Sequence, residues 1–314
     1  MKMKNLISST DLNKIEYEKI IRLGVKFAKK GIASDILKGK VIATLFFASS
    51  TRNRNAFQSA ILRAGGGWIG ANSAEELSMG KGESLGDTIR QYSEFCDLIV
   101  LRHPDDNAAK IAAENSSVPV INCGSGSESY GFAPAVVLFM MMMYLGKLKN
   151  LQIGIYGTPG INRVIKECVP VFGLYKARLY IDALGICPLP KEVEELAGKN
   201  GIGSIEYGKL DDFISKVDIL FSTRALQKGI KDFPKELESE IMKNYKPINI
   251  GHINRMKKGA FFHHISPRVF EVEQDVDSHP KSLWTKRLYF TECALATMIH
   301  FLKVNKKFGA CIEQ

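Results

Sequence analysis

A run of hydroxyl and basic side chains, Ser50-Thr51-Arg52-Asn53-Arg54, stands between two stretches of contrasting pattern. The stretch that ends at Phe47 is apolar, as in a buried strand, whereas residues 57–63 have helical periodicity. The first N–H groups of a helix lack partners within the helix and attract anions. The two hydroxyls add donors, and the planar guanidinium of Arg52 suits a phosphate. The run therefore predicts either a phosphate site or an ordinary helix cap beside solvated arginines.

Four more segments carry basic or small polar residues where a predicted strand ends or where glycines form a loop. An arginine at the carboxyl end of a strand can complete an anion pocket, although a salt-bridged arginine explains such a residue equally well. The glycine-rich loop holds one lysine, and a mobile surface loop explains it too. The segments are Ser78–Ser84 with Lys81, Arg102–Pro104, Thr223–Arg224 and His264–Arg268.

A further turn, Gly157–Arg163, follows an apolar run and precedes a helical pattern, and Asp182 ends the next predicted strand. That order occurs in dinucleotide-binding βαβ units. The glycines, however, are spaced G-x-x-G with a proline inside, rather than G-x-G-x-x-G. We therefore interpret the turn as structural, with Arg163 directed toward a cleft, and keep a nicotinamide-dependent enzyme as an alternative.

The composition is that of a soluble globular protein, with 45% hydrophobic and 24% charged residues in a chain of 314. That length suits two domains of ordinary size. The net charge of +10 comes from lysines scattered among acidic residues, so it does not predict a nucleic-acid site. No apolar run has the length of a membrane span, and no signal peptide is apparent. We expect a cytoplasmic protein with no nucleic-acid and no membrane partner.

The 6 cysteines and 6 histidines are spread along the chain without the spacing of metal ligands. The cysteines form no C-x-x-C pair, and most stand in apolar contexts. We expect buried free thiols in a reducing compartment, no metal and no cofactor.

Strand-like and helical runs alternate along the chain, which predicts parallel sheets covered by helices on both faces. The expected fold class is α/β, with two doubly wound parallel-sheet domains joined by interdomain helices. A methionine-rich helix near 134–146 separates a first domain, 1–134 completed by a C-terminal helix at 290–306, from a second domain at 147–289. Ligands of open α/β sheets collect at the carboxyl ends of the strands. The expected strands are 41–47, 68–71, 98–102, 119–122, 151–156, 177–181, 219–222, 247–249 and 260–264.

Taken in order, these segments resemble the aspartate/ornithine carbamoyltransferase family, and within it the aspartate carbamoyltransferase catalytic chains. The resemblance covers nearly the whole chain. It is carried by the Ser-Thr-Arg-x-Arg run, the Gly-Lys-Gly-Glu-Ser loop followed by Asp87-Thr88, Arg102-His103-Pro104 and the segment Asp218–Arg224.

The resemblance implies transfer of a carbamoyl group from carbamoyl phosphate to the amine of an aspartate-like amino acid. It implies a homotrimer with active sites between subunits, to which a further subunit could attach. The first domain would bind carbamoyl phosphate and the second the amino acid. The phosphate would be held by Ser50, Thr51, Arg52, Asn53 and Arg102, while Arg54 braces the loop. The catalytic residues would be Arg52, Lys81, Arg102 and Tyr130. Ser78 and Lys81 would reach in from a neighbouring subunit as further substrate-binding residues. The second substrate would be bound by Arg163, Arg224 and Ser266.

The sequence departs from the family pattern where the carbamoyl group would be handled. Tyr130 and Ala133 replace the family's histidine and glutamine, and Asn53 replaces the threonine between the two arginines. Two further departures affect the second substrate's residues: Ser266 stands within the altered His-Pro-Leu-Pro turn, and Leu226, followed by Gln227, replaces a glutamine. Tyr130 keeps a hydroxyl donor, whereas Ala133 offers none.

Loss of one oxyanion donor typically costs about 3 kcal/mol of transition-state stabilisation. Two hypotheses therefore stay open. The protein is an active carbamoyltransferase, or it is a catalytically impaired paralogue that binds phosphate or dicarboxylate ligands or assembles with an active homologue.

Overall fold

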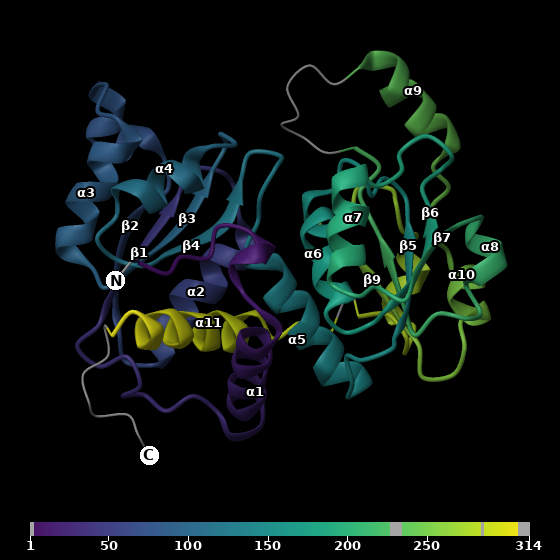
Figure 1. Cartoon of the computed structure of the whole chain (residues 1–314), viewed down its shortest axis with the longest axis horizontal. Helices are drawn as coiled ribbons and strands as arrows, with labels where there is room; N and C mark the ends of the chain where they lie inside the picture. The colour runs from purple at the N-terminus through teal and green to yellow at the C-terminus, as the bar shows by residue number, and fades with distance from the viewer. Residues whose placement is uncertain (1–2, 227–233, 284–285, 307–314) are drawn as a thin grey trace. The chain divides into compact units, whose positions relative to one another are not determined.

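The computed structural model describes residues 3–226, 234–283 and 286–306 (Figure 1). The chain divides into two compact units. One unit runs to Phe139 and resumes at Tyr289, and the other spans Met140–Leu288. Within the described residues, no helix is both long enough and apolar enough to cross a membrane.

The first unit contains a four-stranded sheet in which all paired strands are parallel. In Figure 1, α3 (Leu85–Phe95) and α4 (Ala108–Asn115) lie on one face of this sheet, opposite α2 (Thr51–Arg63). The last helix, α11 (Phe290–Val304), is buried along most of its length and packs against α2 and α1 (Lys14–Lys30). The strand order is β2 (Gly67–Ala71), β1 (Val41–Phe46), β3 (Leu98–His103), β4 (Val120–Ser125).

The second unit contains a five-stranded sheet, which is also parallel throughout. The chain enters this unit along α5 (Ala133–Leu145). The strand order is β7 (Ser204–Tyr207), β6 (Arg178–Asp182), β5 (Gln152–Tyr156), β8 (Ile219–Ser222), β9 (Phe261–His264). Its other helices are α6 (Arg163–Gly173), α7 (Lys191–Lys199), α8 (Leu210–Phe213), α9 (Lys235–Asn244) and α10 (Ile250–Arg255).

Short 3-10 turns are η1 (Ser9–Asp11), η2 (Ala74–Glu76) and η3 (Ser78–Lys81) in the first unit and η4 (Gln274–Ser278) in the second.

The predicted α/β class with two parallel sheets is confirmed, and two strand predictions need correction. Residues 247–249 do not form a strand: Ile248 makes an isolated bridge to Val272, and the Asn249 side chain accepts the N–H of His252. That cap turns the chain into α10 before a strand can extend. Conversely, β7 was not predicted, because its residues are half-buried or exposed and show no apolar run.

In each sheet, successive strands are added first on one side of the starting strand and then on its other side, so the strand order reverses at one point. In the first sheet, β1 and β3 are neighbours, and their connections lead to opposite sides. In the second sheet, β5 and β8 stand in the same relation. Such a switch point opens a crevice at the carboxyl ends of the two strands. Residues that directly follow β1, β3, β5 and β8 are therefore placed where ligands of this fold class bind.

Candidate active site

The N-terminus of α2 lies at the switch point of the first sheet and carries the predicted phosphate residues. Ser50 is its N-cap, with an extended backbone, and no described side chain caps the helix. Thr51 and Arg52 are exposed. Because no side-chain acceptor has to be displaced, the first-turn N–H groups of this helix of 13 residues can receive an anion.

Arg102 reaches the same edge from β3. It pairs with Phe46 across the sheet, and its carbonyl oxygen accepts the N–H of Phe47 at 2.8 Å. Its Nη1 donates to the carbonyl oxygen of Cys123 at 2.9 Å, which anchors the guanidinium to β4. Its Nε is buried and has no hydrogen-bond partner among the described residues. The guanidinium is thus held in place through Nη1, while its Nε–H can still donate a hydrogen bond.

Asn53 and Tyr130 are joined by a hydrogen bond between side chains. The Asn53 Nδ2 donates to the phenolic oxygen, which links the first turn of α2 to the loop that follows β4. Asn53 is only 3% exposed, and its Oδ1 is buried without a hydrogen-bond partner in the described structure. Behind this pair, the rings of Phe57 and Phe132 pack with centroids 4.9 Å apart.

Arg52 completes this group. Desolvation of its guanidinium lowers the pKa of Arg52, and electrostatic interaction with Tyr130 partly offsets that shift. The structure therefore brings Arg52, Asn53 and Tyr130 together in one cluster.

Ala133 is buried at the start of α5, and its N–H donates to the carbonyl oxygen of Tyr130 at 2.9 Å. It has no side-chain polar group to add to the cluster.

The loop that carries Tyr130 is built around the buried amide of Asn122. Its Oδ1 accepts the N–H of Gly124 at 2.8 Å, and its Nδ2 donates to the Ser129 hydroxyl at 2.8 Å. Within the loop, Gly126 has a positive φ of 48°, and a Cβ there would lie 1.7 Å from an Asp106 carboxylate oxygen. Both features fix the course of the loop, and they thereby fix the position of Tyr130.

Ser78 and Lys81 stand apart from this cluster. Both are exposed on η3, and neither side chain makes a hydrogen bond or ion pair within the described ranges. Arg54, the other arginine of the run, donates from Nη1 to Asn72 Oδ1 at 2.8 Å and so connects α2 to the chain after β2.

In the second unit, Arg163 is the first residue of α6. Asn162 caps this helix by accepting the N–H of Ile165 at 3.1 Å. The preceding turn is packed closely, since a Cβ on Gly160 would lie 2.3 Å from the Pro188 carbonyl oxygen. Asp182 accepts backbone N–H groups with both carboxylate oxygens, from Leu184 and Leu210. Both carboxylate oxygens of Asp182 therefore already accept hydrogen bonds from the protein backbone rather than from a ribose hydroxyl. This favours the structural interpretation of the turn over a dinucleotide site.

Arg224 follows β8, the strand that borders β5 at the second switch point. Its carbonyl oxygen accepts hydrogen bonds from Thr158 Oγ1 at 2.7 Å and Thr223 Oγ1 at 3.0 Å. Thr158 belongs to the turn before Arg163, so the two hydroxyls connect the backbones that carry the two arginines. The Nε of Arg224 is buried without a hydrogen-bond partner among the described atoms.

Glu271 holds the segment after Arg224, and sequence analysis missed it. It is 2% exposed, and its carboxylate accepts the N–H of Ala225 at 3.1 Å and of Val269 at 2.7 Å. Burial alone would raise the pKa of Glu271, but these hydrogen bonds and nearby His264 outweigh burial and lower it. A lone glutamate in an irregular segment carries no pattern that could have identified it.

The segment after β9 contains Ser266, which precedes a cis peptide bond to Pro267. His264 is buried, and its Nδ1 lies 2.9 Å from the Ser222 hydroxyl. Burial lowers the pKa of His264 to about 4, so its ring is neutral at pH 7. Arg268 pairs with both carboxylate oxygens of Asp277, at 2.6 and 2.9 Å, as expected for a salt-bridged arginine. Gln227 lies outside the described residues.

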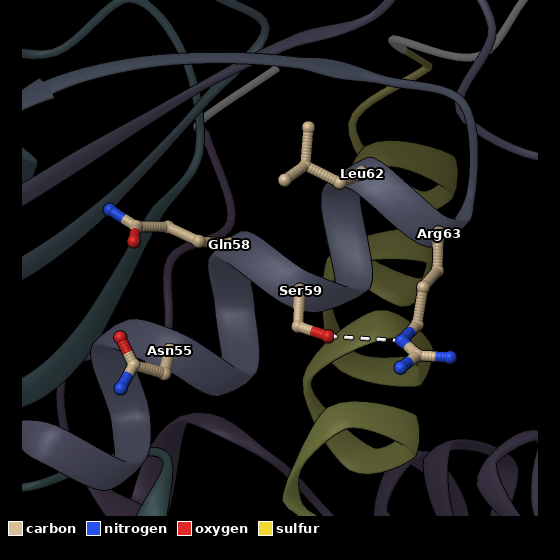
Figure 2. Close-up of a pocket in the computed structure, with 5 residues that line it drawn as sticks. All are labelled: Asn55, Gln58, Ser59, Leu62 and Arg63. Atoms are coloured by element: carbon tan, nitrogen blue, oxygen red, sulfur yellow. Dashed lines mark hydrogen bonds between the residues drawn. The ribbon is translucent and has the colours of Figure 1, made fainter.

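A hollow along α2 is lined by five residues of that helix alone (Figure 2): Asn55, Gln58, Ser59, Leu62 and Arg63. Arg63 Nε donates to Ser59 Oγ at 3.1 Å across it. None of the predicted site residues lines this hollow, and we assign it no part in the site. In the described ranges, no group of three or more His, Cys, Asp or Glu residues could hold a metal ion.

Comparison with known proteins adds an independent observation. Residues 4–131 match the family described as aspartate/ornithine carbamoyltransferase, carbamoyl-P binding domain. The aspartate carbamoyltransferase catalytic subunit of Methanocaldococcus jannaschii is 35% identical over 295 residues, covering 92% of this chain and 94% of that protein. The catalytic subunit of Korarchaeum cryptofilum is also 35% identical, over 288 residues, covering 90% and 93%.

Solved structures agree with these relatives. The catalytic subunit of the M. jannaschii enzyme superposes with a TM-score of 0.85 at 32% identity, over 98% of this chain and 100% of that one. The aspartate transcarbamoylase of Trypanosoma cruzi, solved with N-(phosphonacetyl)-L-aspartic acid, has a TM-score of 0.85 at 22% identity, covering 96% of each chain. The second likeness concerns the fold alone.

Proposed function

This chain belongs to the aspartate/ornithine carbamoyltransferase family, and we propose that it transfers a carbamoyl group from carbamoyl phosphate to the amine of aspartate. The observation that carries the proposal is the placement of an arginine pair at the switch point of each sheet. Arg52 and Arg102 serve the first sheet, and Arg163 and Arg224 serve the second. Two sets of fixed positive charge match a phosphate on one substrate and two carboxylates on the other.

The reaction asks little covalent chemistry of the protein. The amine nitrogen attacks the carbamoyl carbon, a C–N bond forms, and the C–O bond to phosphate breaks. The proton lost by the amine leaves with the phosphate. Catalysis then consists of holding the two substrates in line and stabilising the charge on the tetrahedral intermediate and on the departing phosphate.

We assign the carbamoyl phosphate role to residues 1–134 with 290–306, and the amino-acid role to residues 147–289. Ser50, Thr51, Arg52, Arg102 and the backbone N–H of Asn53 would hold the phosphate. Tyr130 would donate a hydrogen bond from its hydroxyl to the carbamoyl oxygen. Arg163 and Arg224 would bind the carboxylates of aspartate, and the backbone around Ser266 would face its amine.

Ser78 and Lys81 support a further part of the proposal, a homotrimer in which each site is completed by a neighbour. Both residues are exposed, and neither has a side-chain partner within the described part of its own chain. Lys81 would then add a positive charge beside the phosphate of the adjacent subunit. A further subunit could attach to such a trimer. Sedimentation velocity of the purified chain measures its mass directly, and a monomer at assay concentration would contradict this part.

We also propose a cytoplasmic location. Five cysteines are free thiols, four of them buried, which is usual for proteins of a reducing compartment. The sixth, Cys311, lies outside the described residues.

One specific observation supports a second candidate function, that of an impaired paralogue. Ala133 stands where the family pattern has a glutamine and has no side-chain polar group, so one partner of the carbamoyl group is missing. Such a protein would still bind phosphate or a dicarboxylate at its arginines.

A single pair of measurements separates the two candidates. The purified chain is supplied with saturating carbamoyl phosphate and aspartate, carbamoyl-aspartate is measured colorimetrically, and phosphate binding is measured by calorimetry. We expect product above the enzyme-free background and loss of product in Arg52→Ala. Phosphate binding without product identifies the impaired paralogue. Absence of both overturns the proposed function.

A further inference from the structure

The contact between Asn53 and Tyr130 joins two of the departures from the family pattern. Each residue differs from the one expected at its position, and the structure places the two side chains in a direct hydrogen bond. They lie 77 positions apart in the sequence. A contact between two replaced residues suggests that they act as one unit.

The unpartnered oxygen of Asn53 shows what this unit lacks. Asn53 is 3% exposed, its Nδ2 is used by Tyr130, and its Oδ1 is buried with no donor in the described structure. Buried amide oxygens are almost always hydrogen-bonded, because leaving one without a donor is costly. A ligand that brings an N–H or O–H to this atom would remove that cost.

The chemistry of the surroundings narrows the ligand. The first turn of α2, with Arg52 and Arg102 nearby, suits a phosphate, whose oxygens only accept hydrogen bonds in the dianionic form. The Asn53 Oδ1 also only accepts, so it cannot serve the phosphate itself. It requires a donor group attached close to the phosphate. The amide nitrogen of carbamoyl phosphate is such a group.

We propose that Asn53 and Tyr130 together bind the carbamoyl group: Asn53 Oδ1 accepts an N–H of its amide, and the Tyr130 hydroxyl donates to its carbonyl oxygen. This inference rests on the proposed function. The carboxamide of Asn53 and the carbamoyl group have the same spacing of oxygen and nitrogen. The phenol can therefore close a ring of three hydrogen bonds, accepting from Asn53 Nδ2 and donating to the ligand.

This arrangement supplies both contacts that the family pattern assigns elsewhere. Tyr130 provides the carbonyl donor, and Asn53 provides the amide acceptor that Ala133 does not. The phenol keeps its proton throughout, so no step is added to the reaction. Asn53 becomes the residue that distinguishes a carbamoyl group from an acetyl group of similar shape, which carries a methyl in place of the amine.

Two stable phosphonates form the matched probe pair. Phosphonoacetamide carries the amide, and acetonylphosphonate carries a methyl ketone in its place, so both present a phosphonate and a carbonyl oxygen. Calorimetry gives a dissociation constant for each, and inorganic phosphate is titrated as the reference. For the wild-type chain we expect phosphonoacetamide to bind about tenfold more tightly than the ketone, as for one hydrogen bond to a buried acceptor.

Variants then assign the preference to a residue. Asn53→Leu should bring the ratio of the two dissociation constants close to one, while phosphate binding changes less than about twofold. Tyr130→Phe should weaken both phosphonates and preserve their ratio, since both contain the carbonyl. Asn55→Leu, an exposed position on the same helix, is the matched control and should alter none of the three values. Asn53→Ala repeats the comparison if the leucine variant does not bind phosphate.

Each result bears on a specific claim. A wild-type chain that binds phosphate but does not prefer the amide overturns this inference and leaves the anion site intact. A preference that persists in Asn53→Leu and Asn53→Ala overturns it as well. A wild-type chain that binds neither phosphate nor phosphonate overturns the proposed function itself.

Discussion

The Nδ2 of Asn53 donates a hydrogen bond to the hydroxyl of Tyr130, so the first turn of α2 and the loop after β4 share one contact at the edge of the sheet. Arg52, in the same turn of α2, carries a charge that interacts with Tyr130, and Arg102, on β3 in the same sheet, is anchored to the carbonyl oxygen of Cys123. The departures from the family pattern at 53 and 130 are therefore coupled in space, and substitutions at these positions have to be considered together.

Restoring the family residues tests this coupling. Tyr130→His alone removes the partner of Asn53, so we expect lower thermal stability and no gain in kcat/KM. The triple variant Asn53→Thr, Tyr130→His, Ala133→Gln restores the whole family arrangement. Because the triple variant exchanges the Tyr130 donor for the family's own donor, its kcat/KM for carbamoyl-aspartate formation should return to about the wild-type value, about a hundredfold above that of Tyr130→His alone. A single variant Tyr130→His that is as active as the triple one would contradict the coupling.

Arg102 is expected to dominate phosphate affinity in the first unit. In the wild-type chain, the Cys123 carbonyl oxygen fixes the Arg102 guanidinium, whose Nε is buried and has no hydrogen-bond partner among the described residues. Arg102→Ala removes this guanidinium. Hydrogen bonds to charged groups are worth about 1.5–3 kcal/mol, so the dissociation constant for phosphate should rise about 10- to 100-fold by calorimetry. Arg63→Ala removes the same charge from α2 and is the control. Equal losses in both variants would indicate a general charge effect instead.

Thr223 is expected to position Arg224 for the second substrate. Thr223→Val removes the hydroxyl that accepts the Thr158 N–H at 2.7 Å and donates to the Arg224 carbonyl oxygen. We expect the KM for aspartate to rise about tenfold, as for loss of one or two buried hydrogen bonds, with a smaller change in kcat. Phosphate affinity should not change. A fall in kcat with an unaltered KM for aspartate would contradict a positioning role.

His264 predicts how stability depends on pH. Its pKa is about 4 in the folded chain, because burial disfavours the charged ring, and about 6.5 when unfolded. The unfolded state therefore binds the proton first as the pH falls. The stabilising contribution is complete above pH 6.5 and is lost progressively toward pH 4, by up to about 3 kcal/mol.

Urea unfolding at several pH values measures this dependence. His264→Phe has no group to titrate there, so its free energy of unfolding should change less steeply between pH 6.5 and 4 than that of the wild-type chain. The pKa of His103, His252, His279 and His300 is also lowered by burial, and these residues contribute a remaining slope of the same sign. Identical slopes in the two proteins would show that His264 does not titrate as described.

Much of the fold and several site residues could be predicted from sequence because the signals are local. Apolar runs such as 41–47 and 98–102 mark buried strands whatever surrounds them. Their ends mark the carboxyl edge of a parallel sheet, so Arg52, Arg102 and Arg224 could be proposed as anion-binding residues from their places at or shortly after the ends of strands. The prediction at 247–249 was wrong because Ile248 is buried, as in a strand, but Asn249 caps a helix.

The pairing of Asn53 with Tyr130 could be decided only by the tertiary structure. Each residue taken alone is a departure from a pattern, and no periodicity relates positions 77 apart. The same is true of Glu271, whose carboxylate meets the N–H of Ala225 only because two irregular segments fold against each other. Strands and helices are specified by the spacing of apolar residues over short stretches of sequence, whereas side-chain hydrogen bonds between distant residues depend on how helices, strands and loops pack together. The sequence by itself determined the sheets and their arginines; the three-dimensional packing decided which polar atoms are satisfied and which buried ones, Asn53 Oδ1 among them, have no hydrogen-bond partner in the described structure.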